Sequence, residues 1–145
     1  MELILVGTII WLVSQTIKFL LFIFKGGKVT PASAFWIYVW IGKFPSSHTA
    51  LLSGVMYTIW HEQGTSFLFG FSVICSAVFI FTLAENRKRY EMLRVYCDQI
   101  YDPSIRSIIS DGKLGEFEGH TVLEIVAGFI LGIVVAVIVG IYVSY

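Results

Sequence analysis

The chain has 145 residues, enough for one domain. Apolar residues make up 57% of it and charged residues only 14%. This is more apolar surface than a soluble domain of this size can bury, so the composition excludes an ordinary soluble protein. The net charge of zero excludes the basic surface that a nucleic-acid partner requires. We therefore predict an all-α integral membrane protein with a single domain over residues 1–145.

Lysine and arginine occur only within residues 18–43 and 87–113. The rest of the chain is mostly apolar, and the polar turn at 61–64 divides its middle part, so that four apolar segments result. A helix needs about 20 residues to cross ~30 Å of hydrocarbon. The second segment is short for this task, so we expect it to cross with help from its flanks or to lie against protein. We predict a bundle of about four transmembrane helices, formed by Leu3–Phe24, Pro45–Trp60, Ser66–Ala84 and Thr121–Tyr145.

Two connecting segments have their own character. Thr30–Ile41 is aromatic but too short to cross a bilayer, which favours an interfacial segment. Glu85–Ile100 alternates charged and apolar residues, which predicts a helix on the cytoplasmic surface or a continuation of the third span. Within the last span, Gly128 and Gly132 form a small-residue face that suits close helix packing. This face and the short second span are compatible with a homodimer.

The positive charges predict the orientation. Apart from Lys18, every lysine and arginine lies in the segment that follows the first or the third predicted span. The turn at 61–64 carries no lysine or arginine. Cationic loops remain on the cytoplasmic side. We therefore predict a protein of the cell or inner membrane, with its active face toward the cytoplasm and both termini on the opposite side.

The first polar motif, Pro45-Ser46-Ser47-His48, opens the second predicted span. Proline suits a first helical turn, and the serines can cap it. The exposed N–H groups and the positive end of the helix dipole favour an anion. His48 beside them can donate a proton to a departing oxygen. The alternative is an ordinary N-cap followed by a histidine without a chemical role.

The second polar motif opens the last span. His120 and Glu124 are four residues apart, so on a helix they share one face. A carboxylate bonded to one imidazole nitrogen leaves the other free to attack an electrophile. Thr121-x-x-Glu124 is also a capping box, and this second interpretation stays open.

Two cations complete the candidate site on the same predicted face. Lys18 lies about six residues, ~9 Å, before the cytoplasmic end of the first span. An ionisable group at this depth is a functional candidate, although a lysine can also extend its amine to the interface. Arg87 ends the third span and can bind phosphate oxygens bidentately, or can simply anchor the helix.

Together these motifs resemble the divergent membrane branch of the phosphatidic-acid-phosphatase type 2 superfamily, which is related to acid phosphatases and vanadium-dependent haloperoxidases. The resemblance covers nearly the whole chain. It rests on motifs that occur in the family's order: Gln15-x-x-Lys18, Pro45-Ser46-Ser47-His48-Thr49-Ala50, Arg87, and Gly119-His120-Thr121 followed by Gly128.

The resemblance implies a role for each of these residues. His120 would attack phosphorus to form a phosphohistidine, with Glu124 orienting it in place of the usual aspartate. His48 would protonate the leaving oxygen. The phosphate would be held by the remaining polar residues, Lys18, Arg87, Ser46 and Ser47. No metal or other cofactor is implied, because cations and dipoles stabilise the charge on phosphorus.

The chain also departs from the family pattern. The usual Ser-Arg before the last histidine is replaced by Lys113-Leu114, and only Arg87 remains of the Asp-Ala-x-Gly-Val-Arg stretch. Lys43 and Lys113 are reserve candidates for the missing cation. We predict metal-independent hydrolysis of a lipid phosphate or diphosphate at the cytoplasmic face. The alternatives are a catalytically inactive phospholipid-binding protein and, ranked last, a small transporter or channel subunit.

Overall fold

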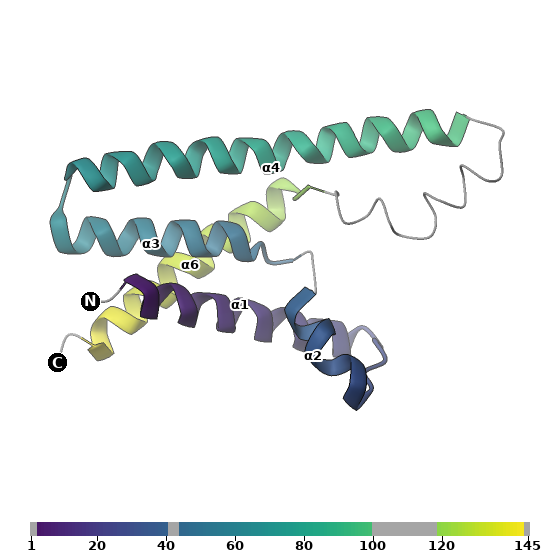
Figure 1. Ribbon diagram of the computed structural model, residues 1–145, viewed down its shortest axis with the longest axis horizontal. Coiled ribbons are helices and arrows are strands. Elements are labelled where there is room, and N and C mark those ends of the chain that lie inside the picture. The colour runs from purple at the N-terminus through teal and green to yellow at the C-terminus, as the bar shows by residue number, and fades with distance from the viewer. Residues whose placement is uncertain (1–2, 41–43, 100–118, 144–145) are drawn as a thin grey trace.

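The computed structural model describes residues 3–40, 44–99 and 119–143, and the elements in these ranges are α-helices. They are α1 (Leu3–Phe24), α2 (Pro31–Trp40), α3 (Ser47–Gln63), α4 (Phe67–Gln99) and α6 (Val122–Val143). Figure 1 shows α3 lying between α4 and α1, with α6 crossing them obliquely. The all-α prediction is confirmed for these ranges.

Three helices are long and apolar enough to cross a membrane, namely α1, residues Phe67–Tyr96 of α4, and residues Val122–Tyr142 of α6. This supports an integral membrane protein. The fourth predicted span is not confirmed, because α3 has 17 residues and is about 25 Å long. It buries Ser47, Thr49, Ser53 and Thr58 and contacts α1, α4 and α6. Protein neighbours, rather than lipid, therefore surround much of this polar helix.

The surface helix predicted at 85–100 is not a separate element. It continues the third span as the 33-residue helix α4, which extends beyond the other helices in Figure 1. Residues 71–99 contain no glycine or proline that would break the helix. Ion pairs Arg89–Glu85 and Arg87–Glu91, each four residues apart, also bridge the junction between its apolar and charged parts.

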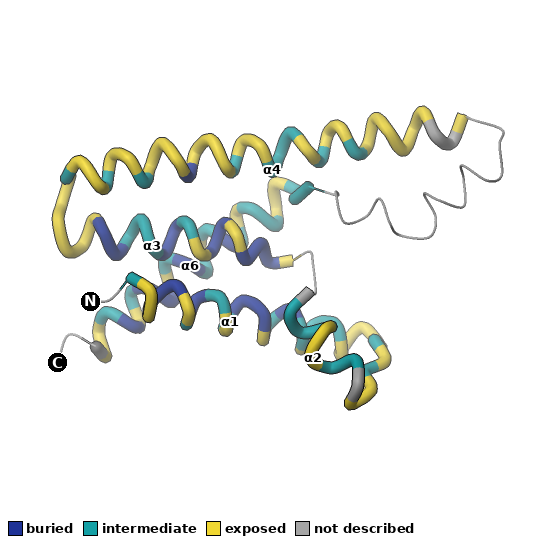
Figure 2. Tube along the Cα trace, viewed as in Figure 1, coloured by how far each residue is buried: buried dark blue, intermediate teal, exposed yellow. Residues whose placement is uncertain are grey.

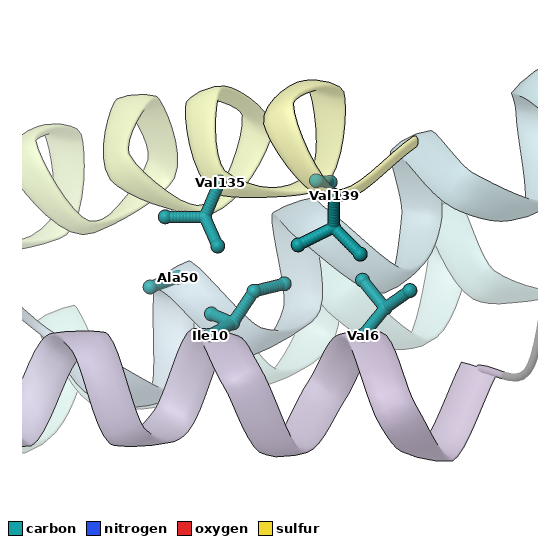
Figure 3. Packing of buried hydrophobic residues seen from close by; sticks show 6 residues of the cluster. Val6, Ile10, Ala50, Val135 and Val139 are labelled. Atoms are coloured by element: carbon teal, nitrogen blue, oxygen red, sulfur yellow. The ribbon is translucent and has the colours of Figure 1, made fainter. Parts of the chain in front are cut away.

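The core forms where α1, α3 and α6 meet. Figure 3 shows Val6 and Ile10 of α1 and Ala50 of α3 pointing toward Val135 and Val139 of α6. Figure 2 shows buried positions concentrated on these three helices, whereas α4 is mostly exposed. A single apolar contact region thus fixes three helices relative to one another and leaves α4 attached mainly along α3.

Glycines allow α3 and α6 to approach closely. A Cβ on Gly132 would overlap the carbonyl of Ala50, and one on Gly54 would lie 2.9 Å from the carbonyl oxygen of Gly132. Ser53 Oγ donates to the carbonyl of Phe129 across this contact, at 2.9 Å. The small-residue face predicted for packing is therefore occupied within the chain. The homodimer stays a prediction, and Gly132 no longer supports it.

The helix ends lie on the sides of the bundle that the predicted alternation of loops requires (Figure 1). The first turn of α1, the last turn of α6 and the link between α3 and α4 lie at one end of the bundle in Figure 1. The beginnings of α3 and α6 point away from that end. The histidines that open α3 and α6 are consequently on the same side of the bundle.

Candidate active site

The start of α3 is held by hydrogen bonds to its own first turn and to α6. Ser46 is the N-cap, and its buried Oγ accepts from Thr49 N at 3.3 Å and from Thr49 Oγ1 at 3.0 Å. Ser46 N donates to the Glu124 carbonyl at 3.1 Å. A Cβ on Gly128 would overlap the Ser46 carbonyl, so glycine at 128 permits this contact. The openings of α3 and α6 are thus joined through backbone atoms.

Gly119 places the second histidine motif against α4. A Cβ at this position would overlap the Leu83 carbonyl and Arg87 N. The chain therefore passes directly over the α4 backbone one residue before His120. Any larger residue at 119 would push His120 away from α4, which gives the glycine of the Gly-His-Thr motif a physical reason.

The structure brings His48 and His120 together from distant parts of the sequence. Their ring centroids are 5.7 Å apart, with the planes inclined at 58°. His48 also lies against Phe79 of α4, with centroids 5.9 Å apart. The Nε2 atom of His120 is buried and has no hydrogen-bond partner among the described residues. One imidazole nitrogen is thus enclosed beside a second, more exposed histidine.

Burial lowers the pKa of His120 below its ordinary value of 6.5. The Glu124 carboxylate opposes this change, while His48 and Lys18 act in the same direction as burial. Neutral imidazole is therefore favoured at neutral pH, and neutral imidazole is the form that can act as a nucleophile.

Lys18 belongs to the same cluster. It is 6% exposed, and its charge influences both histidines. No described residue accepts a hydrogen bond from its ammonium group or forms a salt bridge with it. The Glu124 carboxylate is the anion whose charge acts on Lys18 without a salt bridge to it. A buried cation without a hydrogen-bonded anion is costly in the free protein, which makes the position suitable for an anionic ligand.

Glu124 makes the capping box that the sequence Thr121-x-x-Glu124 predicts. Its Oε2 accepts from Thr121 N at 2.9 Å, and Thr121 Oγ1 accepts from Glu124 N at 3.3 Å. No hydrogen bond joins Glu124 to His120 in the described part of the chain. Glu124 therefore acts on His120 electrostatically here, and its role in orienting the ring stays a prediction.

Arg87 lies beside the cluster through its backbone, but its side chain is engaged elsewhere. Nε donates to Glu91 Oε1 at 2.6 Å, one turn further along α4. The Arg87 side chain is 26% exposed. A ligand phosphate would therefore have to share the guanidinium with Glu91, or draw it toward the histidines.

A comparison with known families identifies the family of this chain. The model of the divergent PAP2 family matches residues 1–135, nearly the whole chain. The chain belongs to the divergent PAP2 family. This confirms the resemblance inferred from the histidine motifs. No curated protein matches the chain, and no solved structure matches it.

Gln15 has no role predicted from the sequence, but the structure places it beside the candidate site. Gln15 is 4% exposed. Its Nε2 donates to the Val39 carbonyl at 2.8 Å, and its Oε1 accepts from Ser47 Oγ at 3.2 Å. An uncharged amide one turn before Lys18, on the same helix face, was the available signal. The Ser47 hydroxyl is thereby directed to α1.

Some predicted features of this divergent PAP2 site stay predictions. Lys43 and Lys113, the reserve cations, lie outside the described residues. Within the described residues, no group of three or more histidine, cysteine, aspartate or glutamate side chains could hold a metal ion.

Proposed function

We propose that this protein hydrolyses a membrane lipid phosphate or diphosphate through a phosphohistidine, without a metal, at the cytoplasmic face. The observation that carries the proposal is the enclosure, beside His48, of the unpartnered His120 Nε2 and of the buried Lys18, whose ammonium has no hydrogen-bond acceptor among the described residues. A phosphate group would satisfy both. Family membership supports phosphatase chemistry in general, and the three apolar helices support a lipid substrate.

In the proposed first step, His120 Nε2 attacks phosphorus. A P–N bond forms while the P–O bond to the lipid breaks, and protonated His48 gives its proton to the departing oxygen. Lys18, Arg87 and the first N–H groups of α3 stabilise the charge on phosphorus. The serines Ser46 and Ser47 shape this end of α3, and backbone N–H groups supply its donors to phosphate.

In the proposed second step, water attacks the phosphohistidine. Neutral His48 now accepts a proton from the water, the P–N bond breaks, and inorganic phosphate leaves with His120 restored. His48 thus alternates between acid and base, and each cycle returns both histidines to their starting protonation states. Glu124 favours the positively charged intermediate by its electrostatic effect on His120.

The primary test is phosphate release by purified protein in detergent with EDTA. The panel contains phosphatidate, phosphatidylglycerophosphate and polyprenyl phosphates. We expect turnover on at least one lipid and a fall of about 10²- to 10⁴-fold in kcat for His48→Ala, because the leaving oxygen loses its proton donor. His61→Ala is the matched control, because His61 lies at the other end of α3. Absence of turnover on every lipid would contradict the proposal.

One structural observation favours a second candidate, a non-catalytic phospholipid-binding protein. The Arg87 Nε, the Glu124 Oε2 and the hydroxyls of Ser46 and Ser47 all have protein partners. The Ser-Arg motif is also missing from the chain. Binding of the same lipids without phosphate release, by folded protein, would support this candidate instead.

Lys18→Met separates a ligand-binding role from a structural one. We expect the substitution to raise the thermal midpoint of the folded protein, because it removes a buried charge that has no hydrogen-bonded anion and keeps the side-chain volume. It should also weaken inhibition by vanadate at least tenfold. Lys25→Met, at an exposed position just beyond α1, is the control. A lower midpoint with unchanged vanadate inhibition would assign Lys18 a structural role.

A further inference from the structure

The described contacts place one side chain, Gln15, between three helices. Gln15 lies on α1, accepts from Ser47 of α3 and donates to Val39 of α2. The Val39 carbonyl can only accept, which fixes the orientation of the amide. Among uncharged side chains, only an amide presents a carbonyl acceptor and two donors together. Glutamate at this position would oppose the Val39 carbonyl, and leucine would satisfy neither partner.

The helix α2, which accepts the hydrogen bond from Gln15, is uncharged and exposes aromatic side chains. It contains no charged residue, and its Phe35 and Trp36 are 66% and 61% exposed. It is attached to α1 by a second contact, in which Tyr38 packs edge-on against Trp11 and Phe19. The last carbonyls of a helix have no partner within it, and Gln15 supplies one for Val39.

The helix at the near side, α3, carries His48 directly after Ser47. Ser46 is already fixed to Thr49 and Glu124. The bond from Ser47 to Gln15 is therefore a further restraint on the turn that presents His48. Without it, the first turn of α3 would keep its hydrogen bond to α6 but lose its hydrogen bond to Gln15, and with it the connection through Gln15 to α2.

We propose that Gln15 is a positioning residue, which ties α2 to the first turn of α3 and so sets the orientation of His48. This role rests on the proposed phosphatase function only for its consequence in catalysis. The tie itself is a property of the fold and can be measured without a substrate.

The test uses Gln15→Met in the full-length protein, which removes both hydrogen bonds and keeps an unbranched side chain. The matched control is Tyr38→Phe. The Tyr38 hydroxyl bonds Thr16 Oγ1 at 3.0 Å and the Leu12 carbonyl at 3.1 Å, so it joins the same two helices without reaching α3. We expect amide hydrogen exchange to rise in both α2 and residues 46–50 for Gln15→Met, and in α2 alone for Tyr38→Phe.

Kinetics give the second measurement. We expect Gln15→Met to lower kcat about tenfold with a smaller change in KM, because His48 acts on the leaving oxygen only in the transition state. Tyr38→Phe should stay within about twofold of the natural protein. Ser47→Ala should reproduce the effect on residues 46–50. The double variant Gln15→Met/Ser47→Ala should then be no worse than Gln15→Met, since Ser47→Ala removes only a bond that Gln15→Met has already lost.

Three outcomes would overturn the role of Gln15. They are unchanged exchange at residues 46–50 in Gln15→Met, equal effects of Gln15→Met and Tyr38→Phe, and additive effects of Gln15→Met and Ser47→Ala. If Gln15→Met does not fold, exchange in Ser47→Ala decides, because it removes the same bond from the other side. If the natural protein releases no phosphate, the proposed function fails while the exchange results still decide whether the tie exists.

Discussion

His120→Ala is expected to abolish phosphate release and the formation of a covalent phosphoenzyme. Its Nε2 is the enclosed nitrogen with no described partner, and burial lowers the pKa of the ring. No other described histidine can replace it, since His61 lies at the far end of α3 and His48 is needed as the acid. Loss of a covalent nucleophile removes the whole reaction path, so the fall should exceed that for His48→Ala.

The measurement is trapping of labelled phosphate from the substrate identified in the lipid panel. Phosphohistidine is stable in alkali and labile in acid, which distinguishes it from a phosphoserine on Ser46 or Ser47. His61→Ala should leave trapping unchanged. Label retained in His120→Ala would contradict the assignment of the nucleophile.

The pH dependence follows from the same residue. A histidine attacks only when neutral, and the pKa of His120 is lowered from 6.5. As the pH falls, the nucleophile should therefore be protonated only below 6.5, and the acid limb of kcat/KM should lie there. An acid limb above this value would indicate a different group.

Gly132→Val is expected to be the most destabilising single substitution in the helix contacts. A Cβ at this position would meet the Ala50 carbonyl and Ser53 Oγ. Backbone atoms cannot rotate away, so α3 and α6 would have to separate. Overpacking in a well-packed core costs roughly 1–3 kcal/mol, and a clash with backbone belongs at the upper end.

The effect should extend beyond stability. Separation of α3 from α6 would break the Ser53–Phe129 hydrogen bond and shift Ser46 relative to Glu124. The measurement is thermal unfolding in detergent together with phosphate release. Gly70→Val is the matched control, because a Cβ there has nothing within 4 Å. Equal midpoints for the two variants would show that the close approach of α3 and α6 is not required.

Much of the site follows from the sequence because its residues stand in short motifs at helix ends. The placement of the charges predicted that His48 and His120 share one face, and the structure places their rings 5.7 Å apart. Helix periodicity likewise gave the capping box at Thr121 and Glu124. The capping box depends only on neighbouring residues, and the charge placement only on the order of residues along the chain, so both can be predicted without the fold.

Whether α3 spans the membrane and how far α4 extends could not be predicted from composition alone. Apolar content alone favoured a fourth span at 45–60, but α3 is short and buries polar residues against three helices. A change from apolar to charged composition after residue 84 predicted either a surface helix or a continuation of the third span, and the continuation is what the structure shows. The α4 helix continues through this change, because its backbone hydrogen bonds run within the helix and the i,i+4 ion pairs Arg89–Glu85 and Arg87–Glu91 bridge the junction.

The sequence by itself determined the membrane character, the family, the helices that carry the histidines and the side of the bundle on which they lie. Only the tertiary structure decided the partners of each polar group. It directs Ser47 to Gln15, Arg87 Nε to Glu91, and Gly128 to the Ser46 carbonyl. Hydrophobic pattern and charge are summed over many residues and survive small shifts in position. A hydrogen bond needs two atoms within about 3 Å, and that distance is set by packing between helices that are remote in the sequence.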